Sequence, residues 1–240
     1  DLPGDPLALA EEIFGGWTNP GQAAAPHDVP RPRERRLFLV DRPGSVQADV
    51  RLARFTIDRR DPRWADLQIA TYSLGGAFLS RLNGVLREEK GYTYGVHCAT
   101  TPLRDGGLTT VSGSFRTEVV ADAVALVPRL LDVAERPLDA AEVRRARTYL
   151  LGVQPLQYAT ASGVCNGALS LLAAGLSTSF VDNLRDALRA VTPASASAAA
   201  TELLPPDELT LVVVGDAAAL APALAERGFA VEVLPPDGQP

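Results

Sequence analysis

The sequence predicts an α+β fold, in which helices cover one face of an antiparallel-dominated sheet. Two pairs of short stretches with alternating apolar and polar residues, separated by turn residues, lie within residues 36–57 and 94–115. Between residues 118 and 203 the pattern is almost entirely helical, and a strand, a helix and a strand close the chain. Because strands and helices come in groups, we expect the helices to form one layer on the sheet.

The composition bounds the class of protein. A chain of 240 residues with 46% hydrophobic and 22% charged residues can bury a core without disulfides. The net charge of -6 and the lack of a basic run argue against nucleic acid as a partner. The apolar runs are too short for a membrane span, so no membrane partner is expected. We expect a cytoplasmic location, while a periplasmic one stays open because the sequence contains no methionine and so lacks a start residue.

Residues 1–35 are expected to be the tail of a preceding half and a linker. Residues 6–14 favour a short helix ended by a glycine pair, and a connector rich in Pro, Gly and Ala follows. The opening DLPGDPLALAEEIFGGW loosely matches GDAAALAPALAERGF, which starts at Gly215 after the apolar strand LTLVVV. This match suggests that the chain is the second part of a duplicated protein and that residues 36–240 form its domain.

The first elements of this domain are two strands over 36–41 and 45–57, around a Pro-Gly turn. The second strand would place four apolar residues on one face: Val46, Ala48, Val50 and Leu52. A helix over 61–74 then breaks at a Gly-Gly pair, and a second helix over 80–89 ends at Gly91, a natural left-handed cap.

The next elements are strands over 94–101 and 108–115, joined by the turn Arg-Asp-Gly-Gly. Helices fill residues 118–203, with breaks expected at Pro137, Gln154-Pro155, Gly175 and Thr192-Pro193. The chain closes with a strand over 209–214, a helix over 217–227 and a strand over 229–233.

The histidines and cysteines do not form a metal site or a nucleophilic dyad. His27 and His97 are the only histidines, and no His-x-x-Glu-His or Cys-x-x-Cys motif exists, so no metal is expected in this chain. His97 and Cys98 are neighbours on a predicted strand and would point to opposite faces. Cys98 and Cys165 are expected to be reduced, buried thiols.

Arg87 and Tyr94 are the strongest candidates for chemistry. If the helix ends near residue 90 and the chain turns over Gly91 into a strand, the tyrosine returns beside the last helical turn. An arginine fork and a phenol there would form a paired donor site for a negatively charged oxygen, such as that of a polarised peptide carbonyl. From the residues alone, a surface arginine and a half-buried tyrosine remain the alternative.

The stretch LGGAFLSRLNGVLREEKGYTYGV, residues 74–96, resembles the pitrilysin, insulysin and mitochondrial processing peptidase family of inverted-zincin peptidases. DRPGSVQADVRL and VVVGD also resemble this family. The resemblance implies two halves of like fold around a chamber, one with zinc on a His-x-x-Glu-His motif and the other with an arginine and a tyrosine. Those two residues match Arg87 and Tyr94. It therefore implies that this chain is one half of a mitochondrial processing peptidase-like protein, of the non-zinc type.

Other residues of the stretch and its surroundings have weaker assignments. Gly75 and Gly76 would permit a helix break and close packing, Ser80 would cap the helix that carries Arg87, and Arg81 would pair with an acid of the sheet layer. Three further residues are weak candidates for contact with a bound peptide: Tyr92, Thr109 and Ser112.

The resemblance leads to three hypotheses. In the first, the chain is a non-catalytic half or subunit of a zinc metallopeptidase, binds extended peptide and stabilises the scissile carbonyl. Zinc then comes from a homologous His-x-x-Glu-His partner, as a separate bacterial subunit in a heterodimer or as an upstream half, and this chain alone is inactive. We prefer the separate subunit on the wording Ser-Arg-Leu-Asn and Gly-Tyr-Thr-Tyr-Gly. The alternatives are a proteolytically inactive scaffold subunit of the same fold and an unrelated α+β ligand-binding domain.

Overall fold

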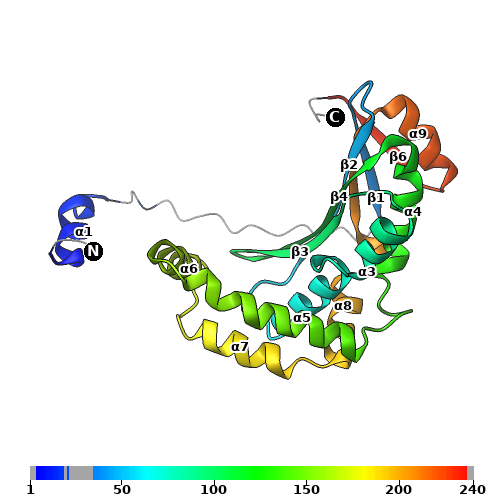
Figure 1. The fold of residues 1–240 in the computed structure, drawn as a ribbon. Coiled ribbons are helices and arrows are strands. Elements are labelled where there is room, and N and C mark those ends of the chain that lie inside the picture. The colour runs from blue at the N-terminus through cyan, green and yellow to red at the C-terminus, as the bar shows by residue number, and fades with distance from the viewer. Residues whose placement is uncertain (1–3, 19–20, 22–34, 237–240) are drawn as a thin grey trace.

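The computed structural model describes residues 4–18, 21 and 35–236, and these contain one six-stranded sheet (Figure 1). The strands are β1 (Arg36–Asp41), β2 (Gln47–Thr56), β3 (Val96–Leu103), β4 (Gly106–Arg116), β5 (Thr210–Gly215) and β6 (Val231–Leu234). The helices are α1 (Pro6–Phe14), α2 (Trp64–Thr71), α3 (Arg81–Asn83), α4 (Val120–Leu131), α5 (Ala140–Val153), α6 (Ala161–Ala173), α7 (Phe180–Ala190), α8 (Pro193–Leu203) and α9 (Ala217–Glu226). No helix within these residues is long and apolar enough to cross a bilayer.

The sheet has the order β3-β4-β2-β5-β1-β6. Three of its five pairings are antiparallel, which confirms the predicted antiparallel-dominated sheet. The two parallel pairings are those of β1 with β5 and β6, because the helix α9 carries the chain from one side of β1 to the other. The β3–β4 hairpin turns through only Arg104 and Asp105, so both strands reach further into the turn than predicted.

One face of the sheet is buried under helices, as predicted. Along β2, Ala48, Val50 and Leu52 are buried, whereas the residues between them are exposed. Val46 was expected to share the buried face but is exposed, because β2 begins only at Gln47. Figure 1 shows the curved sheet with its helices along the outer side. Among the described residues, no helix covers the inner side of the sheet.

The predicted helical breaks lie where the structure interrupts its helices. A 3-10 turn, η4 (Gln154–Tyr158), follows α5, Gly175 has the left-handed φ of +68°, and the side chain of Thr192 caps α8. The helix predicted over residues 61–74 is shorter, since α2 passes into a π-helical turn, η1 (Tyr72–Gly76). This wider turn brings the glycine pair of the sequence against β3.

Gly75 is required by this close approach. A Cβ atom at Gly75 would lie 2.5 Å from Cβ of Cys98 and 2.9 Å from a methyl group of Leu82. A methyl group does not fit between these atoms without displacing β3 or α3. The expected close packing of the glycine pair is confirmed.

The short helix α1 forms where the sequence predicts it, capped by the side chain of Asp5. None of its residues is buried, although Leu7, Ile13 and Phe14 are apolar. The connector that follows lies mostly outside the described residues, and the division of the chain at residue 35 stays a prediction.

Candidate functional site

The helix that carries Arg87 is short and fixed at its start. The hydroxyl of Ser80 accepts a hydrogen bond from the N–H of Asn83 at 3.4 Å, which confirms Ser80 as the cap. After α3 the chain continues into a π-helical turn, η2 (Gly84–Glu89). Leu82 and Leu86 are fully buried and set the rotation of this segment, so that Arg87 lies at its edge with 29% of its side chain exposed.

The helix ends at Gly91, as predicted, with a left-handed φ of +62°. The N–H of Gly91 donates to the carbonyl of Arg87 at 3.1 Å, and the N–H of Tyr92 donates to the carbonyl of Leu86 at 2.9 Å. The first bond is that of an ordinary left-handed glycine cap. The second spans one residue more than in a Schellman cap, because the last turn is π-helical. This end turns the chain back toward the sheet.

Two side chains hold the loop that carries Tyr94. The amide of Asn83 donates to the carbonyls of Ala77 and Val96, each at 3.0 Å, and accepts from the N–H of Val96 at 2.7 Å. The hydroxyl of Thr93 lies 2.7 Å from the carbonyl oxygen of Ser114 in β4. These bonds fix the helix, the loop and the start of β3 as one unit.

The strand β3 begins two residues later than predicted, and these hydrogen bonds explain why. We expected Tyr94 to be the first residue of β3, but β3 begins at Val96. The hydroxyl of Thr93 donates to the carbonyl of Ser114, in the place of a backbone N–H, so the loop does not extend the β3–β4 ladder. Tyr94 consequently lies in a bend, with 97% of its surface exposed.

Arg87 and Tyr94 both line one open hollow of about 490 Å³. Tyr92 and Gly91 complete its wall on the loop side, and Ser114 and Arg116 of β4 line it from the sheet. The structure therefore brings the two candidate residues to one concave surface. Their action on a peptide stays a prediction.

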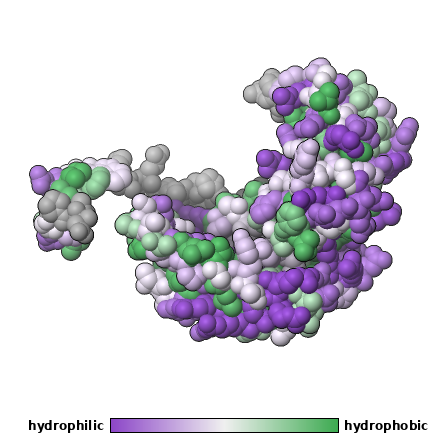
Figure 2. Space-filling model, in the orientation of Figure 1, coloured by the Kyte–Doolittle hydropathy of each residue, from purple (hydrophilic) through white to green (hydrophobic). Residues whose placement is uncertain are grey.

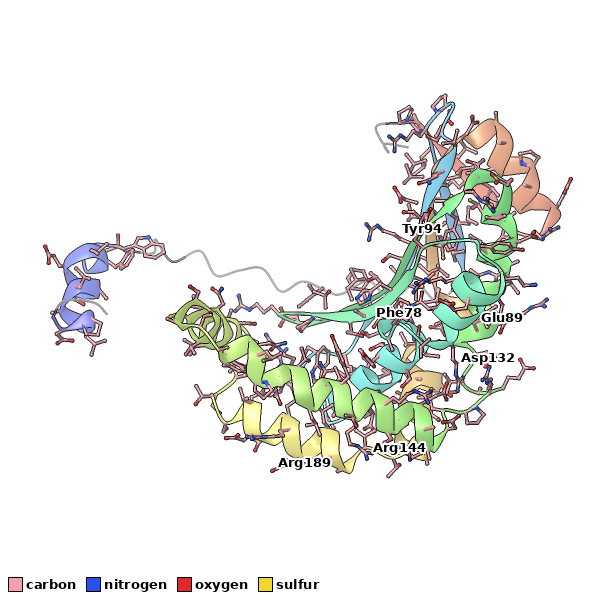
Figure 3. The ribbon with its side chains drawn as sticks, in the orientation of Figure 1. Phe78, Glu89, Tyr94, Asp132, Arg144 and Arg189 are labelled. Carbon is pink, nitrogen blue, oxygen red and sulfur yellow. The ribbon has the colours of Figure 1, made fainter. Side chains whose placement is uncertain are left out.

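The Arg87 guanidinium is supported by an aromatic ring. Its Cζ lies 3.8 Å from the ring centroid of Phe78, a residue that is 63% exposed in the loop before α3 (Figure 3). Nε of Arg87 lies 3.4 Å from a carboxylate oxygen of Glu88, and among the described residues its Nη atoms have no acceptor. A cation–π contact uses the face of the guanidinium, so the edge of the fork remains able to donate.

Arg81 anchors this unit to the helix layer. Its guanidinium donates to both carboxylate oxygens of Glu142 at 2.6 and 2.7 Å, and to the carbonyls of Arg136 and Pro137 at 2.6 and 2.8 Å. The expected acidic partner exists, but it lies at the start of α5, not in the sheet. Burial opposes ionisation of Glu142, yet the bonds from Arg81 and from the N–H of Asp139 outweigh it and lower its pKa.

Sequence reasoning missed several of these residues. Four residues had no predicted role: Asn83 and Thr93, which hold the loop of Tyr94, Phe78, which contacts Arg87, and Glu142, which pairs with Arg81. An asparagine inside an otherwise apolar helix pattern was one available signal, because its amide is neutral to unfavourable there unless it has specific partners.

The weaker peptide-contact candidates have different positions. Tyr92 is half-buried, lines the hollow and packs against the core. Thr109 was expected either to line the chamber or to face solvent, but it is only 2% exposed and bonds the hydroxyls of Thr56 and Thr100 in the helix-covered layer. Ser112 lies three positions along the same strand and is on the open face. The two residues could not share a face, because side chains alternate along a strand.

The described residues do not fit a zinc ion. They contain no group of three or more His, Cys, Asp or Glu that could hold a metal. His97 is exposed on β3 while the neighbouring Cys98 is buried, as predicted, and His27 lies outside the described residues. Burial raises the pKa of the Cys98 thiol to about 12. Cys165, expected to be buried, is exposed on α6.

Comparison with known proteins defines the class of protein as a non-catalytic peptidase domain. Residues 5–150 match the family described as the peptidase M16 inactive domain. The chain belongs to this family, and it corresponds to the second half of pitrilysin-type proteins, as the sequence resemblance indicated. An inactive domain implies that this chain does not hold the catalytic zinc.

The individual relatives agree with this assignment. The chain is 30% identical over 178 residues to an uncharacterized zinc protease of Streptomyces coelicolor, covering 73% of this chain and 36% of that protein. The crystal structure of a peptidase M16 inactive domain from Pseudomonas fluorescens matches with a TM-score of 0.73 and 25% identity, over 82% of this chain and 47% of that one. The chain thus spans about a third to a half of these relatives.

One further match concerns the fold alone. A chain in the structure of complex III2 from Candida albicans has a TM-score of 0.70 at 14% identity, and the match covers 95% of this chain and 57% of that one. The same architecture therefore occurs in proteins of quite different description.

Proposed function

We propose that this chain is the non-catalytic half of a zinc endopeptidase, in which Arg87 and Tyr94 bind the carbonyl oxygen of the scissile peptide bond. The observation that carries the proposal is that both residues line one open hollow, and each has a donor without an acceptor in the described part of the chain. The family match supports a partner half that carries the catalytic zinc. We propose that this half holds the zinc on a His-x-x-Glu-His motif.

In this proposal, both residues donate hydrogen bonds to the carbonyl oxygen, and Arg87 also supplies a positive charge. The Arg87 fork offers a cationic donor with its face on Phe78, and the Tyr94 hydroxyl offers a neutral donor from the exposed loop. Negative charge grows on the carbonyl oxygen as the tetrahedral intermediate forms, so donors placed there stabilise the transition state more than the bound substrate. Metal, general base and water belong to the partner half.

The peptide would lie along the open side of the sheet. Ser112 and Ser114 are on this side, and Ser114 also lines the hollow. We further propose that residues 1–35 end the preceding half and link it to this domain. The apolar residues of α1, none of which is buried here, support this because a surface helix normally covers its apolar side.

The test uses the complex of this chain with its zinc-bearing half, from the adjacent gene or the upstream coding sequence. Arg87→Ala or Tyr94→Phe should lower kcat for an extended peptide by about 10²-fold, while the complex still assembles. Matched controls are Arg189→Ala on α7 and Tyr149→Phe on α5, each outside the hollow. Unchanged kcat in both site variants would refute the assigned role.

The assay also separates the scaffold alternative. A complex that assembles and binds zinc in the partner half, yet cleaves no peptide, would favour a purely structural subunit. The likeness of fold to the complex III2 chain is the observation that keeps this alternative in view.

A further inference from the structure

A second cavity in the described structure shares no lining residue with the hollow of Arg87. It has a volume of about 250 Å³ and is partly open to solvent. Its walls come from the start of α2, the outer half of β3, η4 and the helices α5, α6 and α7.

Two residues that line this cavity each have a buried donor without an acceptor among the described residues. The indole Nε1 of Trp64, a residue only 3% exposed, and Nε of Arg59 are buried and make no hydrogen bond within the described part of the chain. Both residues line the cavity. Buried N–H groups without partners are rare in folded proteins and commonly mark a site for an absent polar group.

The cavity also carries a positive charge that no carboxylate balances. Within residues 4–18, 21 and 35–236, the terminal nitrogens of Arg59 donate only to Ser170, to its hydroxyl at 3.1 Å and its carbonyl at 2.8 Å. The nearby carboxylate of Asp58 is taken by Arg60. No Asp or Glu is among the lining residues. An anion is therefore the natural complement of this end of the cavity.

The remaining walls are mostly apolar. Leu150, Leu171, Leu184 and Leu188 line the cavity from three different helices. Figure 2 shows further apolar side chains gathered at the surface over α6, where Leu172 is exposed. A ligand here thus needs an apolar body as well as an anionic group.

We propose that this cavity binds a carboxylate carried on an apolar chain, with the carboxylate at Arg59 and Trp64 and the chain among the leucines. Such a group could be the C-terminus of an apolar peptide or the head of a fatty acid. The inference stands on the two orphan donors, the unbalanced arginine and the lack of acidic residues in the wall. It does not depend on the proposed peptidase role of Arg87.

The fluorescence of Trp64 can be used to measure ligand binding. The chain has two tryptophans, so Trp17→Phe leaves Trp64 as the sole indole emitter. Octanoate, kept below its micelle concentration, should change this emission with a saturable dependence on concentration. Octanol, which has the same chain without the charge, should bind about tenfold or more weakly, as for loss of a charged hydrogen bond. A flat titration, or equal binding of acid and alcohol, would overturn the proposal.

Variants check that the carboxylate contacts Arg59. In the single-tryptophan background, Arg59→Gln should remove the preference for octanoate over octanol, while Arg51→Gln, an exposed arginine of β2, should leave it unchanged. Calorimetry on Trp64→Phe gives a second reading, in which octanoate binding should weaken about tenfold. If the preference survives both changes at the cavity, the proposal is wrong.

A further set of titrations with peptides distinguishes a peptide C-terminus from a fatty acid as the bound carboxylate. A short leucine-rich peptide with a free C-terminus that binds more tightly than both its amide and octanoate identifies a peptide end. Tighter binding of octanoate than of the free peptide identifies a fatty acid. Equal binding of the peptide acid and its amide, together with no response to octanoate, would contradict both.

Discussion

The buried pair of Arg81 and Glu142 offers the sharpest test of how the site is held. Arg81→Gln removes four donated bonds at 2.6 to 2.8 Å and leaves Glu142 buried, with the N–H of Asp139 at 2.9 Å as its remaining donor. Breaking one side of a buried ion pair costs about 3–5 kcal/mol of unfolding free energy. For a chain of this length the expected fall in Tm is roughly 6–20 °C.

The matched control is Arg227→Gln, which breaks the ion pair with Asp122 on the surface. Both of its side chains are well exposed, so this substitution should leave Tm almost unchanged. Thermal and urea unfolding, followed by circular dichroism, measure both variants. Equal effects of the two substitutions would refute the reasoning from burial.

The loss of stability in Arg81→Gln should also depend on pH, in a direction set by the pKa of Glu142. In the native protein the pKa of Glu142 is lowered, so the pair stabilises the fold fully above the ordinary value of 4.5 and loses this contribution as pH falls through the lowered pKa. In Arg81→Gln, burial is no longer outweighed and the pKa should rise, so Glu142 takes up a proton more readily. The deficit of the variant should therefore shrink from pH 7 to pH 4, and a constant deficit would contradict the assigned cause.

Three further predictions follow from single contacts. Iodoacetamide should modify Cys165 in the folded chain but Cys98 only in denaturant, as mass spectrometry would show, because burial raises the pKa of Cys98 to about 12; labelling of both would contradict this. Gly75→Ala should destabilise by about 1–3 kcal/mol, whereas Gly152→Ala, with open space around its Cβ position, should stabilise by up to ~1 kcal/mol; chemical unfolding distinguishes the signs. Phe78→Ala should lower kcat/KM of the assembled peptidase about two- to fivefold, with Phe78→Trp restoring it; an unchanged value would remove its positioning role.

Much of the fold could be predicted because its signals are local. The strand β1 has the predicted bounds, and the glycine at residue 91 ends its helix as a left-handed cap. The π-helical turns η1 and η2 could not be predicted, since the wider hydrogen bonding depends on how these turns pack against β3 and the core.

The candidate site was predicted in part for the same reason. The spacing of Arg87 and Tyr94 predicted that both could reach one place, and both line one hollow. The side-chain bond of Thr93 to β4, which ends the strand early, joins residues 21 positions apart and has no local signal. Glu142, which pairs with Arg81, lies 61 positions along the chain, and it reaches the arginine only because of how α5 packs.

The helix α1 has a consequence for how assembly can be observed. It has nine residues, fewer than the ~12–15 that an isolated helix needs in water, and none of them is buried within this chain. In the assembly proposed above, the surface that covers Leu7, Ile13 and Phe14 would stabilise this helix. Slow amide exchange at Leu9, whose N–H donates to Asp5 at 3.2 Å, would then serve as a local gauge of completed assembly, independent of catalysis.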